Sequence, residues 1–87
     1  MTIWKYTLNS QTVQEVQMPQ GAEILHAGVQ HNEINIWVMV DLDAQNEVRK
    51  IAVYGTGHSM LKNSHKYIGT VQLAGGTFIF HVFEIID

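Results

Sequence analysis

The stretch that decides the fold reads Ile34-Asn35-Ile36-Trp37-Val38-Met39-Val40-Asp41. Isoleucine and valine occupy every second position, as on the buried face of a β-strand, where successive side chains point to opposite sides. Trp37 and Met39 fall on the other face, so the strand is apolar on both sides over most of its length. This pattern indicates a central strand covered on two faces, or a strand at a subunit interface.

The same period of two recurs along the rest of the chain, between turn residues. We expect further strands at residues 2–8, 12–18, 23–31, 48–54, 66–73 and 77–86. No window shows a sustained helical period, so any helix is expected to be a turn or two around residues 59–62. The sequence therefore predicts an all-β fold of about seven antiparallel strands with little helix, built as a small sandwich or a barrel-like roll.

Turn chemistry predicts how the first two strands pair. Asn9-Ser10-Gln11 lies between residues 2–8 and 12–18, and asparagine and serine favour turns because their side chains bond to nearby backbone groups. Pro19 closes the second strand, since proline cannot donate to a β-ladder. We therefore expect a hairpin here.

Two further connections are short enough for tight turns. Residues 31–33 join two predicted strands, and Ala74-Gly75-Gly76 supplies glycines that permit the positive φ of hairpin turns. Both are expected to form hairpins. Within residues 23–31, the alternation places one apolar set on a common face, namely Leu25, Ala27 and Val29.

Length and composition limit the size of the core. The chain has 87 residues, of which 46% are hydrophobic and 15% charged, and it has no cysteine. A single domain of this size buries about 60–65% of the surface that its unfolded chain exposes, so its stability margin is small. Without disulfides or thiolate metal sites to add stability, we expect one β-rich domain over residues 1–87 that assembles as a homo-oligomer.

The charge balance argues against nucleic-acid polymers as partners. The formal net charge is −3, and the five Lys and Arg residues are scattered rather than gathered in a stripe that would follow a phosphate backbone. No apolar run approaches the roughly 20 residues that span a bilayer, and the first residues lack the pattern of a signal peptide. We expect a cytoplasmic protein with no membrane partner.

The most specific local motif is the turn Gly55-Thr56-Gly57-His58. Its glycines would free backbone N–H groups to converge on an anion, while Thr56 and His58 add side-chain donors. It is neither a P-loop nor a dinucleotide fingerprint, because the lysine and the long helix are missing. Tyr54 and Tyr67 flank the irregular stretch and are the candidates for stacking on a ring. The alternative is a simple glycine turn that ends a strand.

The histidines show no spacing typical of a metal site. They stand at positions 26, 31, 58, 65 and 81, with no HExxH or His-x-His motif, so we expect neither a metal nor a cofactor. No motif supplies a nucleophile, a base and an orienting residue, so we expect no catalytic residues. His81 lies in an apolar strand, where a backbone carbonyl is the ordinary partner. The surface near Trp37 and His81 is the second candidate ligand site.

Short segments spread over nearly the whole chain form a pattern: Ile3-Trp4-Lys5-Tyr6, Met18-Pro19, Gly21-Ala22, Ile36-Trp37, Val40-Asp41, Tyr54-Gly55-Thr56-Gly57-His58, Tyr67-Ile68-Gly69-Thr70, Gln72 and Phe80-His81-Val82-Phe83-Glu84. This pattern resembles a family of small, uncharacterised bacteriophage proteins. The stretch Lys62–His65 departs from that family, since it lacks the acidic and proline residues of the corresponding loop. The resemblance transfers no catalytic residue.

The resemblance implies a class of function. Small phage proteins that form compact oligomers with pockets resemble the sponges that sequester nucleotide signals of bacterial immunity. It implies a non-catalytic homo-oligomer in the host cytoplasm that binds a small phosphorylated ligand, such as a cyclic nucleotide or an ADP-ribose derivative. The alternative is an accessory protein whose exposed apolar strand face binds and inhibits or modulates a host or virion protein.

Overall fold

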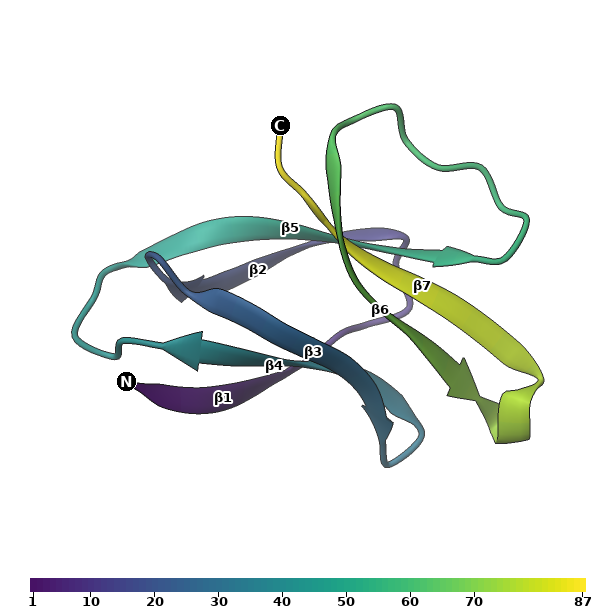
Figure 1. The fold of residues 1–87 in the computed structure, drawn as a ribbon, viewed down its shortest axis with the longest axis horizontal. Coiled ribbons are helices and arrows are strands. Elements are labelled where there is room, and N and C mark those ends of the chain that lie inside the picture. Colours follow the sequence, from purple (N-terminus) through teal and green to yellow (C-terminus); the bar gives the residue numbers. More distant parts are fainter.

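The computed structural model describes residues 1–87 and consists of seven β-strands and one turn of 3₁₀ helix (Figure 1). The elements are β1 (Thr2–Thr7), β2 (Val13–Pro19), β3 (Glu23–Gln30), β4 (Glu33–Val40), β5 (Asn46–Gly55), β6 (His65–Leu73), η1 (Ala74–Gly76) and β7 (Phe78–Ile85). The predicted all-β fold is confirmed. Residues 59–62 form no helix, and no helix of the structure is long and apolar enough to cross a membrane.

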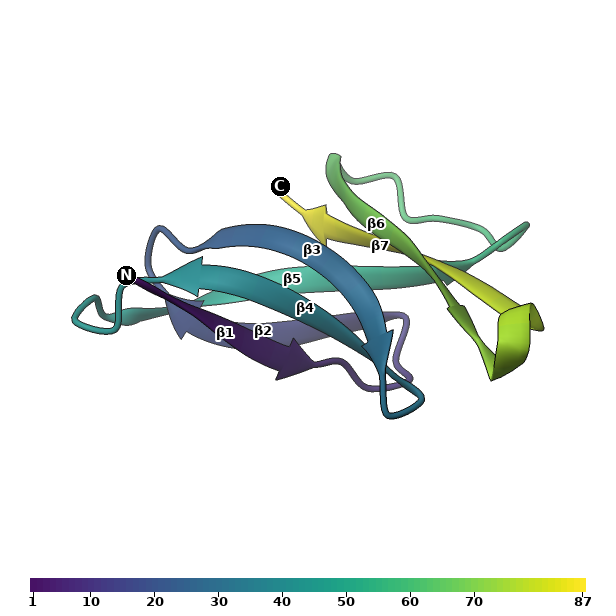
Figure 2. The ribbon, with the colours of Figure 1, turned by 60° about the horizontal axis from the view of Figure 1, so that its bottom comes forward.

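The strands form two antiparallel sheets, with the strand orders β1-β4-β3 and β2-β5-β7-β6. The edge strands β3 and β6 pack against each other without forming a ladder, which joins the two sheets along one side (Figures 1 and 2). Gly69 on β6 allows this approach, because a Cβ there would lie 3.3 Å from the Cβ of Ala27 on β3. The sheets therefore fold over a shared core.

The core lies between the sheets, and β4 provides much of it. The largest fully buried apolar side chains are those of Met18, Ile36, Val38, Val40, Ile51 and Val82. The isoleucine and valine face of β4 is therefore buried as predicted, and β4 is the central strand of its sheet. A second, smaller cluster of Ala52, Tyr54 and Ile85 lies on the outer face of the four-stranded sheet.

The predicted hairpin between residues 2–8 and 12–18 is wrong. β1 pairs with β4 and β2 pairs with β5, so the intervening residues cross from one sheet to the other. The buried side chain of Gln14 holds this crossing: its Oε1 accepts the N–H of Asn9 at 2.9 Å, and its Nε2 donates to the carbonyls of Asn9 and Gln11 at 3.2 Å. Turn residues favour a change of chain direction, but they do not specify which strand the next segment pairs with.

The other two predicted hairpins are confirmed, since β3 pairs with β4 and β6 with β7. The β3–β4 turn places His31 and Asn32 at φ values of 54° and 59°, and the β6–β7 turn has positive φ throughout residues 74–76. Buried Asn35 supports the first turn, because its Nδ2 donates to the carbonyl of Glu33 at 3.0 Å. The predicted turn residues thus match the backbone that each hairpin requires.

Leu25 does not share a face with Ala27, contrary to the prediction. The β3–β4 register shifts between Ile24 and His26, so Leu25 is the extra residue of a β-bulge. Ile24 and Ala27 lie opposite core residues of β4, whereas Leu25 is exposed. Beyond a bulge, the side chains that point to the core change from odd to even positions or the reverse. A strict period of two therefore assigns Leu25 to the core.

An ion pair joins strands inside the four-stranded sheet, at the end of β5 away from the glycine turn. Nε and Nη2 of Arg49 on β5 both donate to the carboxylate of Glu84 on β7, with Nη2 at 3.0 Å from Oε1. Nη1 of Arg49 donates to the carbonyl of Ala22 at 2.9 Å, which ties the β2–β3 turn to this pair. The hydrogen bond with Glu84 raises the pKa of Arg49 above its ordinary value.

Replacement of Glu84 by alanine is expected to lower the free energy of unfolding by about 2–3 kcal/mol, because the largely buried guanidinium loses two charge-assisted hydrogen bonds. Urea denaturation measures this change. Glu15→Ala, an exposed site on β2, is the control and should change stability by no more than about 0.5 kcal/mol. Equal losses in the two variants would contradict a stabilising role for the ion pair.

Candidate functional site

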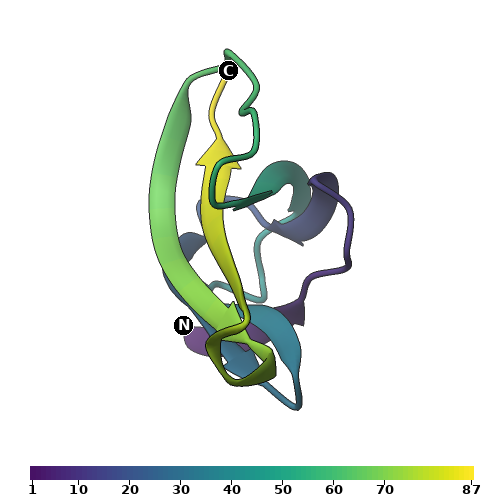
Figure 3. The ribbon, with the colours of Figure 1, turned by 90° about the vertical axis from the view of Figure 1, so that its right-hand side faces the viewer.

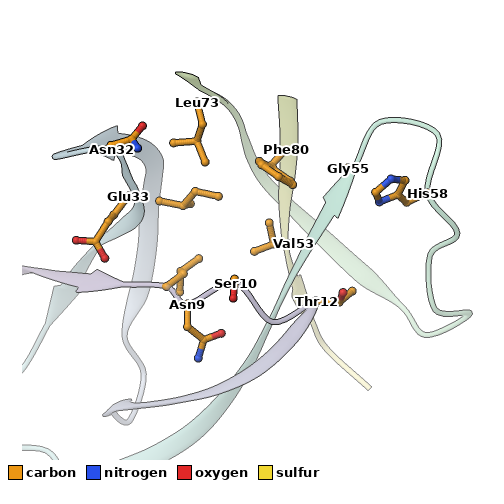
Figure 4. A pocket seen from close by; sticks show the side chains of 12 residues that line it. Asn9, Ser10, Thr12, Asn32, Glu33, Val53, Gly55, His58, Leu73 and Phe80 are labelled. Atoms are coloured by element: carbon orange, nitrogen blue, oxygen red, sulfur yellow. The ribbon is translucent and has the colours of Figure 1, made fainter. Parts of the chain in front are cut away.

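A hollow of about 440 Å³ opens between the sheets, at the end where β5 leads into the glycine turn (Figure 4). Its apolar lining consists of Leu8, Ile34, Val53, Leu73 and Phe80, and its polar lining of Asn9, Ser10, Thr12, Asn32, Glu33, Gly55 and His58. The apolar side chains are buried or half-buried, while the polar ones are mostly exposed. The hollow therefore has an apolar floor and a polar rim, as small-molecule sites commonly do.

Several rim side chains are available to a ligand. The hydroxyls of Ser10 and Thr12, the amide of Asn32 and the imidazole of His58 make no side-chain hydrogen bond within the chain, and each is exposed. The formal charge of the lining is the single carboxylate of Glu33, since no lysine or arginine belongs to it. The rim is thus rich in neutral hydrogen-bonding groups and poor in cations.

The glycine turn positions His58 at this rim. The N–H of His58 donates to the carbonyl of Gly55 at 3.0 Å, and Gly57 has φ 86°, which makes residues 55–58 a β-turn with a glycine at its third position. The ring of His58 packs on Gly55, where an added Cβ would lie 2.8 Å from ring atoms. Because the N–H of His58 is bonded inside the turn, this amide is not free for the anion that the motif suggested.

A second hollow of about 380 Å³ adjoins the first and shares Gly55, His58 and Phe80 with it. Its remaining lining consists of Thr56, Thr77, Phe78 and Ile79. The rings of Phe78 and Phe80 lie stacked with their centroids 6.5 Å apart. His58 and Phe80 therefore border both hollows, and a ligand that fills one of them is in reach of the other.

A chain of hydrogen bonds runs across the outer face of the four-stranded sheet. The hydroxyl of Thr56 lies 2.7 Å from Nε2 of His81, Nδ1 of His81 lies 3.0 Å from Oγ1 of Thr70, and that oxygen lies 2.6 Å from the hydroxyl of Tyr67. A neutral imidazole donates from one nitrogen and accepts at the other, so the chain can run in either direction. Each direction leaves one terminal hydroxyl free to donate.

This chain brings together three of the residues singled out in the sequence, namely Thr56, Tyr67 and His81. The prediction that His81 bonds to a backbone carbonyl is wrong, because both of its ring nitrogens are hydrogen-bonded to threonine hydroxyls. No sequence motif indicates Thr70, because its position opposite His81 depends on the β6–β7 register. Tyr67 remains 57% exposed, so its ring is open to stacking.

The ring of Tyr54 is buried, whereas stacking on a ligand requires an exposed ring face. Tyr54 is 3% exposed, and its hydroxyl accepts the N–H of Leu61 at 3.3 Å and lies 2.8 Å from Nε2 of His65. Nδ1 of His65 lies 2.7 Å from the carbonyl of Asn63. Because a carbonyl only accepts, Nδ1 carries the proton and Nε2 accepts the hydroxyl of Tyr54. Tyr54 therefore holds the loop 56–64 and presents no open ring face.

The same end of this loop is also held by the C-terminus, beside which the loop lies in Figure 3. Oδ1 of Asp87 accepts the N–H of Ser64 at 2.8 Å, and the N–H of Ile86 donates to the carbonyl of Ser64 at 3.0 Å. The bond from Ser64 lowers the pKa of the Asp87 carboxyl, since it favours the ionised form. The end of the loop at residues 61–64 is thus bonded both to Tyr54 and to the C-terminus.

Trp37 lies on the other sheet, away from the residues described above. Its ring packs over Gly28, where a Cβ would lie 3.2 Å from Cζ3, and its centroid is 6.0 Å from that of His26. The structure therefore does not bring Trp37 together with the glycine turn or with His81. No group of three or more His, Asp or Glu side chains is placed to hold a metal ion.

Comparison with known proteins identifies the family. A family model described as a domain of unknown function matches residues 1–87. The chain belongs to the DUF7352 family. No curated protein and no solved structure matches it. The description of DUF7352 gives no activity, so the hollows and polar clusters are the features of this DUF7352 chain that bear on its function.

In this DUF7352 domain, Tyr54→Phe is expected to lower the free energy of unfolding by about 1–2 kcal/mol and to accelerate hydrogen exchange at the Leu61 amide, because Leu61 and His65 lose their shared partner. NMR-detected exchange measures the second effect. Tyr67→Phe is the matched control, since it removes an exposed hydrogen bond elsewhere. Unchanged exchange at Leu61 in Tyr54→Phe would contradict the role given to Tyr54.

Proposed function

We propose that this DUF7352 domain is a non-catalytic binding protein that holds a small organic ligand in the hollow between its sheets. The observation that carries the proposal is the combination of an apolar floor with rim side chains that have no partner within the chain. The volume of about 440 Å³ falls in the range of small-molecule sites, about 300–1,000 Å³.

The arrangement of the histidines favours binding over chemistry. Acid–base or nucleophilic catalysis requires a base within hydrogen-bond reach of the group that it activates. His58 faces the hollow and its ring makes no side-chain hydrogen bond, whereas His81 bonds two hydroxyls on the outer face of the sheet. His58, which a ligand could reach, is therefore a different residue from His81, whose ring is hydrogen-bonded to hydroxyl groups.

A phosphorylated ligand, the class expected from the sequence, would place its ring in the larger hollow and its phosphate beside His58, which borders both hollows. No lysine or arginine lines either hollow. Burial of the ring against Phe80 and Val53 is therefore expected to supply most of the affinity, with a small contribution from the phosphate. Sequestration of a nucleotide signal in a host cytoplasm, expected from the phage resemblance, is the role that we attach to this binding.

The expected result of titrating the ¹⁵N-labelled protein with adenosine and with AMP is a set of chemical-shift changes centred on Ser10, Asn32 and Val53 for both compounds. Because neutral groups dominate the rim, AMP should bind no more than about tenfold more tightly than adenosine. This pair of probes separates recognition of the ring from recognition of the phosphate.

Gly55→Ala sharpens the test, because the added Cβ would lie 2.8 Å from the His58 ring and force it to move. We expect this variant to lose the preference for AMP and to keep most of the affinity for adenosine. Val48→Ala, an exposed site at the opposite end of β5, is the control and should bind as the wild type does. Shift changes centred on Trp37, or no change with either compound, would contradict the proposed site.

A further inference from the structure

β1 is an edge strand with one unpaired side. It pairs with β4 alone, and in Figure 1 no strand lies beyond it at the lower rim of the molecule. Natural edge strands are commonly blocked by proline, charge or bulges. β2, the corresponding edge of the other sheet, likewise has one charged residue, Glu15, but it ends at Pro19. β1 has no proline, no glycine and no register shift, and its one charged residue is Lys5.

The alternation of hydrogen bonds between β1 and β4 shows which backbone groups of β1 face outward. The N–H of Leu8 donates to the carbonyl of Ile34 at 2.8 Å, and the β1–β4 register is unbroken. Bonded residues alternate along an antiparallel ladder. The even-numbered residues of β1, Trp4 among them, therefore bond to β4, and the odd-numbered ones, Ile3 and Lys5 among them, direct their N–H and C=O groups to the free side.

When β1 pairs with β1 of a second copy, one register suits its sequence better than the others. Consider two copies related by a two-fold axis perpendicular to the sheet. Their inner faces lie on the same side of the joined sheet when a residue of β1 lies opposite the same residue of the other copy at the axis. The two centres that keep most of β1 paired are Trp4 and Lys5. A centre at Lys5 places two lysines directly opposite, which is unfavourable, whereas a centre at Trp4 places Lys5 opposite Ile3 of the other copy.

Trp4 is the side chain that this register covers. It lies on the inner face of β1 opposite the core residue Val38, and it is 50% exposed. Since its backbone bonds to β4, two Trp4 residues at the two-fold axis form a non-hydrogen-bonded pair, in which cross-strand side chains are closest. Aromatic pairs in such positions stabilise the pairing of strands.

We propose that two copies of this chain pair antiparallel through β1, centred on Trp4, so that their three-stranded sheets become one continuous sheet. The surface is distinct from the hollows, so the proposal does not depend on the ligand. It gives the homo-oligomer expected from the composition a defined interface, at the edge of the sheet rather than on the outer face around Trp37.

Sedimentation of the purified protein over the micromolar range tests the assembly. The wild type should be dimeric, and Lys5→Pro should weaken dimerisation by at least about tenfold, because it removes an outward N–H without removing a β1–β4 hydrogen bond. Lys5→Ala is the matched control: it loses the bond from Lys5 to Gln30 and keeps the backbone donor, so it should remain dimeric. A monomeric wild type, or a Lys5→Pro variant that dimerises as the wild type does, would overturn the proposal.

Cysteine crosslinking tests the register without requiring a proline to be tolerated. The chain has no cysteine, so a single substitution can form a disulfide only between copies. Under oxidising conditions Trp4→Cys should give a disulfide-linked dimer in high yield. Lys5→Cys should not, because the two positions are offset along the strands beyond the roughly 7 Å between Cα atoms that a disulfide spans. Equal yields from both variants, or a higher yield from Lys5→Cys, would overturn the register centred on Trp4.

Discussion

The close approach of β3 and β6 is the constraint on which the rest of the structure depends. It joins two small sheets along one side, and Gly69 favours it, because a Cβ there would lie within 3.3 Å of the Cβ of Ala27. With the sheets joined there, buried residues of β4 and β5 belong to one core cluster between the sheets. The hollow between Leu8, Ile34 and Phe80 is a consequence of this geometry.

Hydrogen bonds from side chains to connecting segments fix what the sheets leave loose. Gln14 holds the crossing between β1 and β2, and Tyr54 with His65 holds the loop that carries His58. Gln14 bonds Asn9 of the hollow's lining, whereas Tyr54 and His65 lie on the outer face of the four-stranded sheet. The part of the rim at Asn9 is therefore held before a ligand binds, which lowers the entropic cost of ordering that part of the site.

The sequence predicts the strands and the core face of β4 well, because both depend on a local period of two that burial enforces. It does not predict the partner of β1, since turn residues at 9–11 are equally compatible with a hairpin and with a crossing. The bulge at Leu25 and the burial of Tyr54 depend on contacts between distant segments and leave no local pattern. Within the candidate site, a sequence motif indicates Gly55 and His58, whereas only the fold brings Ser10, Asn32 and Phe80 beside them.

The crossing between β1 and β2 has a consequence for how the chain reaches its native state. Neither of the first two strands meets its partner until β4 and β5 are available. The chain up to Pro19 therefore stays unpaired while the hairpins of β3–β4 and β6–β7 are free to form locally. Pairings of such large sequence separation slow folding, because the entropy of closing a long loop is lost before contacts compensate it. During synthesis, β1 thus has no partner strand, and Ile3 and Trp4 stay uncovered, for as long as the segment up to Val40 is incomplete.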